Sequence, residues 1–239
     1  MNDIESRLTS LRLHGMHQAW KSLKQSRQLQ NLEVADVMDV LLQSEEDERQ
    51  NRRYKRLYTS ARFRYNASVE ELKIAATRGL EKSLIASLSA GKYLKNGESV
   101  LITGATGCGK SFLASALGNQ ACSQGYKVMY FNAQKLLTKT KMARVDGTAV
   151  KLFDKIAKTD LLIIDDFGLV ILDDNQRIDL LEIIEDRHAR KSTIIASQLP
   201  VEKWYETIGE ATIADAILDR LINTSHLIEI KGDSMRKKP

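Results

Sequence analysis

The sequence predicts an α/β protein in which helices cover a parallel five-stranded sheet, preceded by a small all-helical region. From Glu98 onward, short β-branched or apolar runs alternate with longer amphipathic segments, which is typical of a parallel sheet with helices on its faces. Before that point apolar residues recur at helical spacing and no proline interrupts them. The runs expected to form strands are 99–103, 127–132, 161–165, 193–197 and 226–230.

Two domains are expected, with residues 1–95 forming the helical one and residues 96–239 the one with the sheet. In the first, Ile4, Leu8 and Leu11 form one apolar stripe, and a second runs from Val34 to Leu42. Glycines at 91 and 97 mark the expected junction. The first domain is expected to bind DNA or a partner.

Composition excludes several classes of protein. The 239 residues carry a net charge of +5, and the excess of basic residues lies in the first 95. No apolar run approaches the roughly 18 residues of a membrane span, and the first residues lack a signal peptide's apolar stretch. Cys108 and Cys122 lack the spacing of metal ligands, so free thiols are expected. These features favour a cytoplasmic location without a membrane partner.

A glycine-rich segment follows the first expected strand and opens a helix. Backbone amides in such a turn point inward, and the positive end of the helix adds to them, so main chain can hold a polyphosphate. We expect Lys110 to reach the β and γ phosphates of ATP and Ser111 to bind Mg²⁺. The alternative is a glycine-rich turn without a ligand. The expected nucleotide-binding residues are Gly104, Ala105, Thr106, Gly107, Cys108, Gly109, Lys110 and Ser111.

Polar side chains end two other expected strands. Asp165 follows four apolar residues, and it is expected to hold the metal ion together with Ser111. Asp166 is the candidate for polarising the attacking water, the alternative for both acids being a solvated strand end. Gln198 is expected to contact the γ-phosphate or water, although a polar residue there is also a common turn former.

Basic residues gather between positions 49 and 65, interleaved with aromatic ones. Such a pattern is typical of a surface that neutralises backbone phosphates, and it predicts salt-dependent, weakly sequence-specific binding to double-stranded DNA. The alternative is a solvated helix with i, i+4 ion pairs, such as Glu45 with Arg49 and Glu48 with Arg52. The candidate DNA-binding residues are Arg49, Arg52, Arg53, Lys55, Arg56, Arg62 and Arg64.

Taken together, these segments resemble an AAA+ ATPase core. They are most similar to the IstB-type helper ATPases of insertion-sequence transposition, relatives of the DnaC and DnaI helicase loaders. The resemblance covers nearly the whole chain and implies a bacterial protein. The segments that carry it are 11–16, 104–111, 162–168, 196–200 with Trp204 following, and 232–236.

The resemblance implies a P-loop NTPase core without a C-terminal helical lid. Asp166 stands where AAA+ proteins usually carry Glu, which implies slow hydrolysis that DNA or a partner stimulates. Gln198 falls at the position of a sensor, and Arg236 resembles a second sensor. Arg220 matches an arginine finger that reaches the nucleotide of a neighbouring subunit, which implies a homo-oligomer. The alternative for Arg220 is a local ion pair with an acid such as Asp215 or Asp219.

The function implied is that of an ATP-dependent, oligomeric helper that assembles on duplex DNA, remodels it and regulates the transposase of its element. A replicative helicase loader is the alternative, because the two kinds of core are hard to tell apart by sequence. A small-molecule P-loop kinase is a third hypothesis, which the absence of an obvious arginine-bearing lid insertion disfavours.

Overall fold

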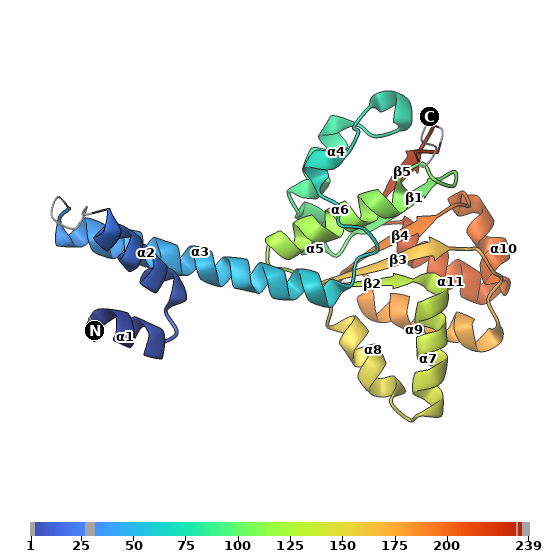
Figure 1. Cartoon of the computed structure of the whole chain (residues 1–239). Coiled ribbons are helices and arrows are strands. Elements are labelled where there is room, and N and C mark those ends of the chain that lie inside the picture. The colour runs from blue at the N-terminus through green and yellow to red at the C-terminus, as the bar shows by residue number, and fades with distance from the viewer. Residues whose placement is uncertain (1–2, 27–31, 233, 236–239) are drawn as a thin grey trace. The chain divides into compact units, whose positions relative to one another are not determined.

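The computed structural model describes residues 3–26, 32–232 and 234–235, and the chain forms two compact units, Met1–Arg56 and Leu57–Pro239 (Figure 1). Residues 57–95, which the sequence groups with the helical domain, thus lie in the same unit as the sheet. None of the helices within the described ranges is both long and apolar enough to span a lipid bilayer.

The first unit contains α1 (Asp3–Ser10), α2 (His14–Gln25) and most of α3 (Val34–Ala61). Its buried side chains include Leu8, Leu23 and Leu41. Glu45 of α3 is also buried, and its carboxylate accepts hydrogen bonds from the amides of Gly15, at 2.8 Å, and Met16, at 3.4 Å. The segment 11–16 therefore places the first turn of α2 against the buried carboxylate of Glu45, which accepts hydrogen bonds from backbone amides of that turn.

The sheet of the second unit is parallel throughout, and its strand order is β2-β3-β4-β1-β5. The expected five strands are confirmed, and their bounds agree with the expected runs to within two residues. The strands are β1 (Ser99–Gly104), β2 (Val128–Asn132), β3 (Leu161–Phe167), β4 (Ser192–Ser197) and β5 (Ser225–Ile230).

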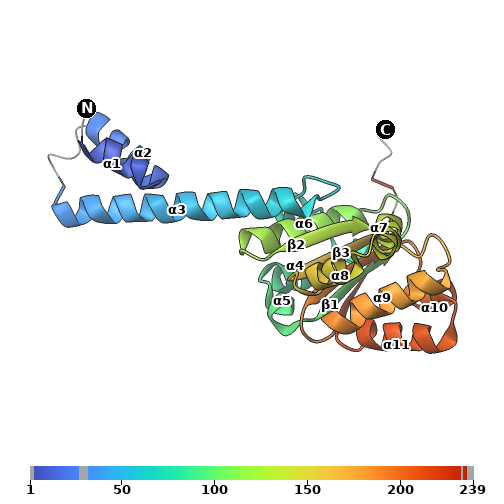
Figure 2. The ribbon, with the colours of Figure 1, turned by 90° about the horizontal axis from the view of Figure 1, so that it is seen from below.

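Helices cover both faces of this sheet (Figures 1 and 2). On one face α6 (Lys110–Ser123) packs so closely that a Cβ at its Gly118 would lie 2.8 Å from Ile163 Cδ1. On the other face, side chains of four longer helices and the short α10 (Trp204–Ile208) form one core with Leu101, Leu162 and Ile195. The four are α7 (Ala133–Val145), α8 (Ala149–Ala157), α9 (Asp174–Arg187) and α11 (Ala211–Ile222).

The stretch between α3 and the first strand is less helical than the sequence suggests. After α3 ends, residues 62–81 hold two short 3₁₀ turns, Val69–Glu71 and Ala76–Arg78, before α4 (Lys82–Ser89) and α5 (Lys92–Asn96). Gly79 has a φ of 74°, and a Cβ there would lie 2.0 Å from the carbonyl oxygen of Glu229. The segment thus lies against β5, next to the phosphate loop, because glycine permits this approach.

Candidate nucleotide-binding site

The glycine-rich loop connects the end of β1 to the first residue of α6, as expected. Gly104, Gly107 and Gly109 have φ values of 142°, 83° and 108°, a region that favours glycine. A Cβ at Gly104 would lie 2.2 Å from the carbonyl oxygen of Ile230 on β5. The backbone therefore turns tightly at the N-terminus of a helix, which is a suitable place for phosphate groups.

The side chains of Lys110 and Ser111 are held at the start of α6. Lys110 is buried, and its Nζ donates to the carbonyl oxygens of Gly104 and Ala105, both at 2.8 Å. Ser111 Oγ donates to Asp165 Oδ1 on β3 at 2.9 Å. The structure thus brings the loop, its lysine and the acidic strand together.

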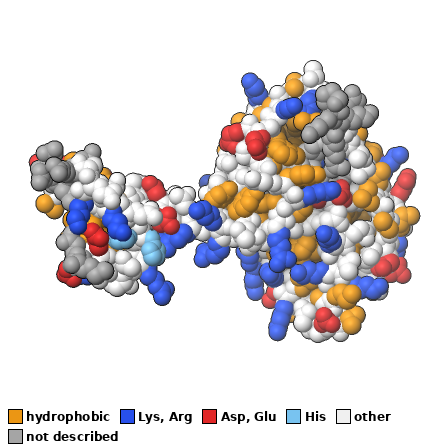
Figure 3. Space-filling model, viewed as in Figure 1, with side chains coloured by type: hydrophobic (Ala, Val, Ile, Leu, Met, Phe, Trp, Pro, Cys, Tyr) orange, Lys and Arg blue, Asp and Glu red, His pale blue; other side chains and the backbone are white. Residues whose placement is uncertain are grey.

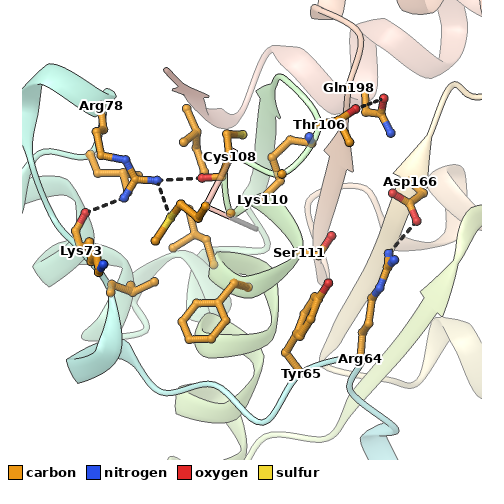
Figure 4. A pocket seen from close by; sticks show the side chains of 18 of the residues that line it. Arg64, Tyr65, Lys73, Arg78, Thr106, Cys108, Lys110, Ser111, Asp166 and Gln198 are labelled. Atoms are coloured by element: carbon orange, nitrogen blue, oxygen red, sulfur yellow. Dashed lines mark hydrogen bonds and ion pairs between the residues drawn. The ribbon is translucent and has the colours of Figure 1, made fainter. Parts of the chain in front are cut away.

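The loop borders a cavity of about 370 Å³ (Figure 4). Asp166 and Gln198 line it together with the loop, as expected from the sequence. The opposite wall comes from residues 64–80, which sequence reasoning did not connect with this site. Apolar side chains that line the cavity include Leu72, Leu80, Phe112, Leu113, Leu169, Ile230 and Met235.

Arg78 ties this wall to the phosphate loop. Its Nη2 donates to the carbonyl oxygen of Cys108 at 2.7 Å, and its Nη1 donates to that of Lys73 at 3.0 Å (Figure 4). Cys108 is fully buried, so its side chain packs inside the protein. No sequence pattern indicated Arg78, because its position depends on the left-handed turn at Gly79.

The two acids at the end of β3 have different surroundings. Asp165 is 1% exposed and accepts hydrogen bonds from Ser111, Tyr130 and Arg64. Burial and the hydrogen bond to Asp165 raise the pKa of the Tyr130 phenol above its ordinary value, so that it stays protonated as a donor. This tyrosine, on the neighbouring strand β2, has no motif that would mark it in the sequence.

Asp166 lies at the edge of the cavity with a left-handed backbone, at a φ of 57°. It accepts from Arg64 Nη1 at 2.7 Å and from Asn132 Nδ2 at 3.1 Å. Such a conformation is uncommon for a residue other than glycine, and it coincides with the irregular pairing of β3 with β4 between Ile164 and Phe167. The side chain is thereby oriented by two donors from other segments.

Arg64 is one of the candidate DNA-binding residues, and the structure places it in the nucleotide site. Burial disfavours the charged form of the Arg64 guanidinium and by itself would lower its pKa. The hydrogen bonds to Asp166 and Asp165 nevertheless raise this pKa above its ordinary value. The aromatic residues near it also pack inside the second unit: Tyr58 lies against Phe63, with ring centroids 5.3 Å apart, and Phe63 lies against Tyr130. Tyr58 and Phe63 thus contribute to the packing of the second unit.

Gln198 follows β4 and faces the phosphate loop. Its Oε1 accepts a hydrogen bond from Thr106 Oγ1 at 2.7 Å, which places the amide group at the edge of the cavity (Figure 4). The neighbouring Ser197 has a structural role, because its hydroxyl donates to the carbonyl of Phe167 at 2.7 Å and accepts from the amide of Leu199.

Arg220 lies at the other end of the sheet. Together with Ser99 and Thr193, near the starts of β1 and β4, it lines a small separate cavity, whereas the phosphate loop follows the end of β1. Its Nε pairs with Glu185 Oε2 of α9 at 2.5 Å, so the local partner is neither Asp215 nor Asp219. Arg236 lies outside the described residues. Nearby, the amide of Met235 donates to the carbonyl of Gly107 at 2.9 Å.

The other basic candidates lie mainly on α3. Arg49 Nε pairs with Glu45 at 2.8 Å, and Arg52 Nε pairs with Glu48 at 3.5 Å, so both i, i+4 pairs of the alternative interpretation are present. The side chains of Arg49 and Arg52 still remain 62% and 44% exposed. On the face shown in Figure 3, Lys and Arg side chains are spread over the second unit among apolar ones. The remaining basic candidates, all exposed, are Arg53, Lys55, Arg56 and Arg62.

The residues around Asp165 fit a divalent cation of the magnesium type. Ser111 and Asp165 offer a hydroxyl and a carboxylate oxygen within hydrogen-bond distance of each other, and Mg²⁺ prefers such hard oxygen ligands. Nucleotide sites bind Mg²⁺ through one or two protein side chains and the substrate phosphates, so a larger cluster of acids is not required.

Comparison with known proteins places this site in a family. The model of the IstB-like ATP-binding proteins matches residues 6–239. An insertion sequence ATP-binding protein of Sinorhizobium fredii is 38% identical over 231 residues, covering 97% of this chain and 94% of that protein. The IS1162 ATP-binding protein of Pseudomonas fluorescens is 39% identical over 196 residues, covering 82% and 85%.

Solved structures share the fold. The DnaC helicase loader superposes with a TM-score of 0.60 at 20% identity, covering 70% of this chain and 98% of that one. DnaI gives a TM-score of 0.61 at 19% identity, covering 70% and 92%. At this level of identity the likeness concerns the fold, which is the AAA+ type of α/β core.

Proposed function

Because this chain belongs to the IstB-like ATP-binding proteins, insertion-sequence helpers with an AAA+ fold, we propose that it hydrolyses the ATP that it binds, as an oligomer on duplex DNA. The observation that carries the proposal is the direct link between Ser111 of the phosphate loop and Asp165 of β3, with Asp166 next to it. A loop that only binds a phosphate does not require a carboxylate pair at this place.

The loop amides hold the phosphate chain, and Lys110 turns from the carbonyls of Gly104 and Ala105 to the β and γ phosphates. Ser111 and Asp165 hold Mg²⁺, which supplies charge neutralisation when it is bound. Asp166 orients the attacking water and accepts its proton. Gln198, held by Thr106, contacts the γ-phosphate or the water.

Assembly into an oligomer completes the site. Arg220 lies at the opposite end of the sheet from the phosphate loop of its own subunit, so it can serve a nucleotide only from a neighbouring copy. A head-to-tail contact of this kind uses two different surfaces and generates rings or helical filaments. The pair with Glu185 would then open when Arg220 reaches the phosphate of that neighbour.

Duplex DNA is the proposed ligand of the assembled helices. Exposed basic side chains on α3 carry the interaction, because backbone phosphates attract them without regard to sequence. Regulation of the transposase of the same element is proposed from the insertion-sequence names of the relatives. A role in helicase loading rests on the fold alone, and recovery of a helicase instead of a transposase in a pull-down would favour it.

Turnover measured with increasing duplex DNA tests the proposal, using the wild type and Asp166→Asn. We expect slow hydrolysis that DNA stimulates and that Asp166→Asn abolishes, with nucleotide binding retained. Electron microscopy with duplex DNA should show an ordered assembly with a non-hydrolysable ATP analogue and none without nucleotide. Equal DNA affinity with and without ATP would contradict ATP-dependent assembly.

A further inference from the structure

One guanidinium bridges the two acids at the end of β3. Arg64 Nη1 lies 2.7 Å from Asp166 Oδ2 and 3.2 Å from Asp165 Oδ2, and Figure 4 shows the side chain pointing towards Asp166. The other oxygen of Asp165 accepts from Ser111. A positive charge of the protein thus lies beside the two groups that would bind magnesium.

A divalent cation competes with Arg64 for this site while Arg64 keeps both contacts. Asp165 is 1% exposed and its two oxygens already accept from three donors, which leaves about one of the four lone pairs of the carboxylate for a metal ion. Two cations close together repel each other strongly where water is largely excluded. Arg64 is the donor that brings a competing charge, whereas Tyr130 and Ser111 are neutral.

The side chain of Arg64 is placed so that it can move away from Asp165. Its side chain is 39% exposed, and its guanidinium lies 5.6 Å from the ring centroid of Tyr65. The shorter of its two contacts is the one to Asp166, which lies at the more exposed edge, with its side chain 20% exposed. Release of Asp165 alone therefore requires a small movement.

We propose that Arg64 is a positioning residue that holds Asp165 and Asp166 together without metal and yields Asp165 to the entering divalent cation while it keeps Asp166. The inference rests on the proposed function and extends it. A metal ion that binds with the nucleotide then competes with the ion pair between Arg64 and Asp165. Arg64 therefore sets the metal concentration at which Ser111 and Asp165 bind the ion. The hydrogen bonds from Tyr130 and Asn132 keep the acids oriented throughout the exchange.

The test measures metal binding to the full chain with Mn²⁺ as the probe. Free Mn²⁺ is followed by electron paramagnetic resonance at a saturating concentration of a non-hydrolysable ATP analogue. Because a contact ion pair is removed, Arg64→Ala and Arg64→Gln should each bind Mn²⁺ at roughly 3- to 10-fold lower concentration than the wild type. Arg190→Ala, which removes a positive charge from an exposed turn after α9, is the control and should leave the midpoint unchanged.

Affinity for the same analogue in EDTA separates a metal effect from general damage to the site. It should not rise in either Arg64 variant, because the phosphate loop is intact and a positive charge beside the cavity has been removed. Folded Arg64 variants with an unchanged or higher Mn²⁺ midpoint would overturn the inference. The measurement does not require turnover, so a wild type that bound Mn²⁺ and nucleotide without hydrolysis would refute the proposed ATPase function while leaving the role of Arg64 intact.

Discussion

Ser111 on the first turn of α6 donates its hydroxyl proton to Asp165 at the end of β3, across 2.9 Å. Because these residues are far apart along the chain, the hydrogen bond depends on β1 and β3 lying in one parallel sheet. The phosphate loop is therefore stabilised by β3, the strand that supplies the acids. A substitution that disrupts the loop or β3 should affect the other element as well.

The backbone at Gly104 is the first point where this account can be tested. Gly104→Ala places a Cβ 2.2 Å from the carbonyl oxygen of Ile230, whereas Gly147→Ala, also at positive φ, meets nothing within 4 Å. Both variants have backbone strain, but only the first adds a clash. Urea unfolding should show Gly104→Ala to be less stable than Gly147→Ala by about 2 kcal/mol. Equal losses would show that the loop can move away from β5.

Arg78 should influence nucleotide affinity through the loop that it holds. Arg78→Ala removes the donor to the carbonyl of Cys108, which is worth about 1 kcal/mol. We expect affinity for a fluorescent ATP analogue to fall roughly fivefold, with a smaller loss in Arg78→Lys. Arg190→Ala is the matched control for charge. Unaltered affinity in Arg78→Ala would show that this wall of the cavity does not support the loop.

Glu45 should make the first unit sensitive to acid. Burial alone would raise the pKa of this carboxyl, but hydrogen bonds from Arg49 and from the amides of Gly15 and Met16 hold it below the ordinary 4.5. Since the folded-state pKa is the lower one, the stabilisation is complete above about pH 4.5 and is lost as the pH falls through the folded-state value.

Hydrogen exchange of the Gly15 and Met16 amides measures this effect. At pH 7, Glu45→Gln should reduce the protection of these amides by an amount equivalent to about 1 kcal/mol. At a pH below the folded-state pKa, the wild type and the variant should exchange alike, because the wild-type carboxyl is then also neutral. A difference that stayed constant between the two pH values would contradict the assignment.

Arg220 should act on the nucleotide of a neighbouring copy. Lys110→Ala and Arg220→Ala should each be inactive alone, and an equal mixture should regain roughly a quarter of wild-type turnover if neighbours associate at random. Restored turnover requires an intact loop from one copy and an intact arginine from another. The absence of any recovery in mixtures that sedimentation shows to co-assemble would exclude the trans role.

Much of the fold could be predicted because its signals are local. The strands are short apolar runs bounded by polar residues and glycines, and the phosphate loop combines its glycines, lysine and serine within eight positions. Residues 62–81 were harder to predict, because the approach of Gly79 to the carbonyl of Glu229 depends on a contact between distant segments.

The residues that surround the two acids of the site could not be predicted for the same reason. Tyr130, Asn132 and Arg64 converge on the two acids only after β2 and the segment following α3 have packed beside β3. A basic run predicts an exposed surface, yet the position of one arginine within it depends on tertiary contacts. Arg187 is another example, since it is buried among carbonyl groups of Ile156, Thr159 and Ser192.

Nucleotide binding by Lys110→Ala tests the central claim most directly. The account attributes recognition of the triphosphate to the loop amides together with this one ammonium group, so calorimetry with ATP and Mg²⁺ should show binding in the wild type and a loss of at least about tenfold in the folded variant. Unchanged affinity and unchanged turnover in Lys110→Ala would contradict the account.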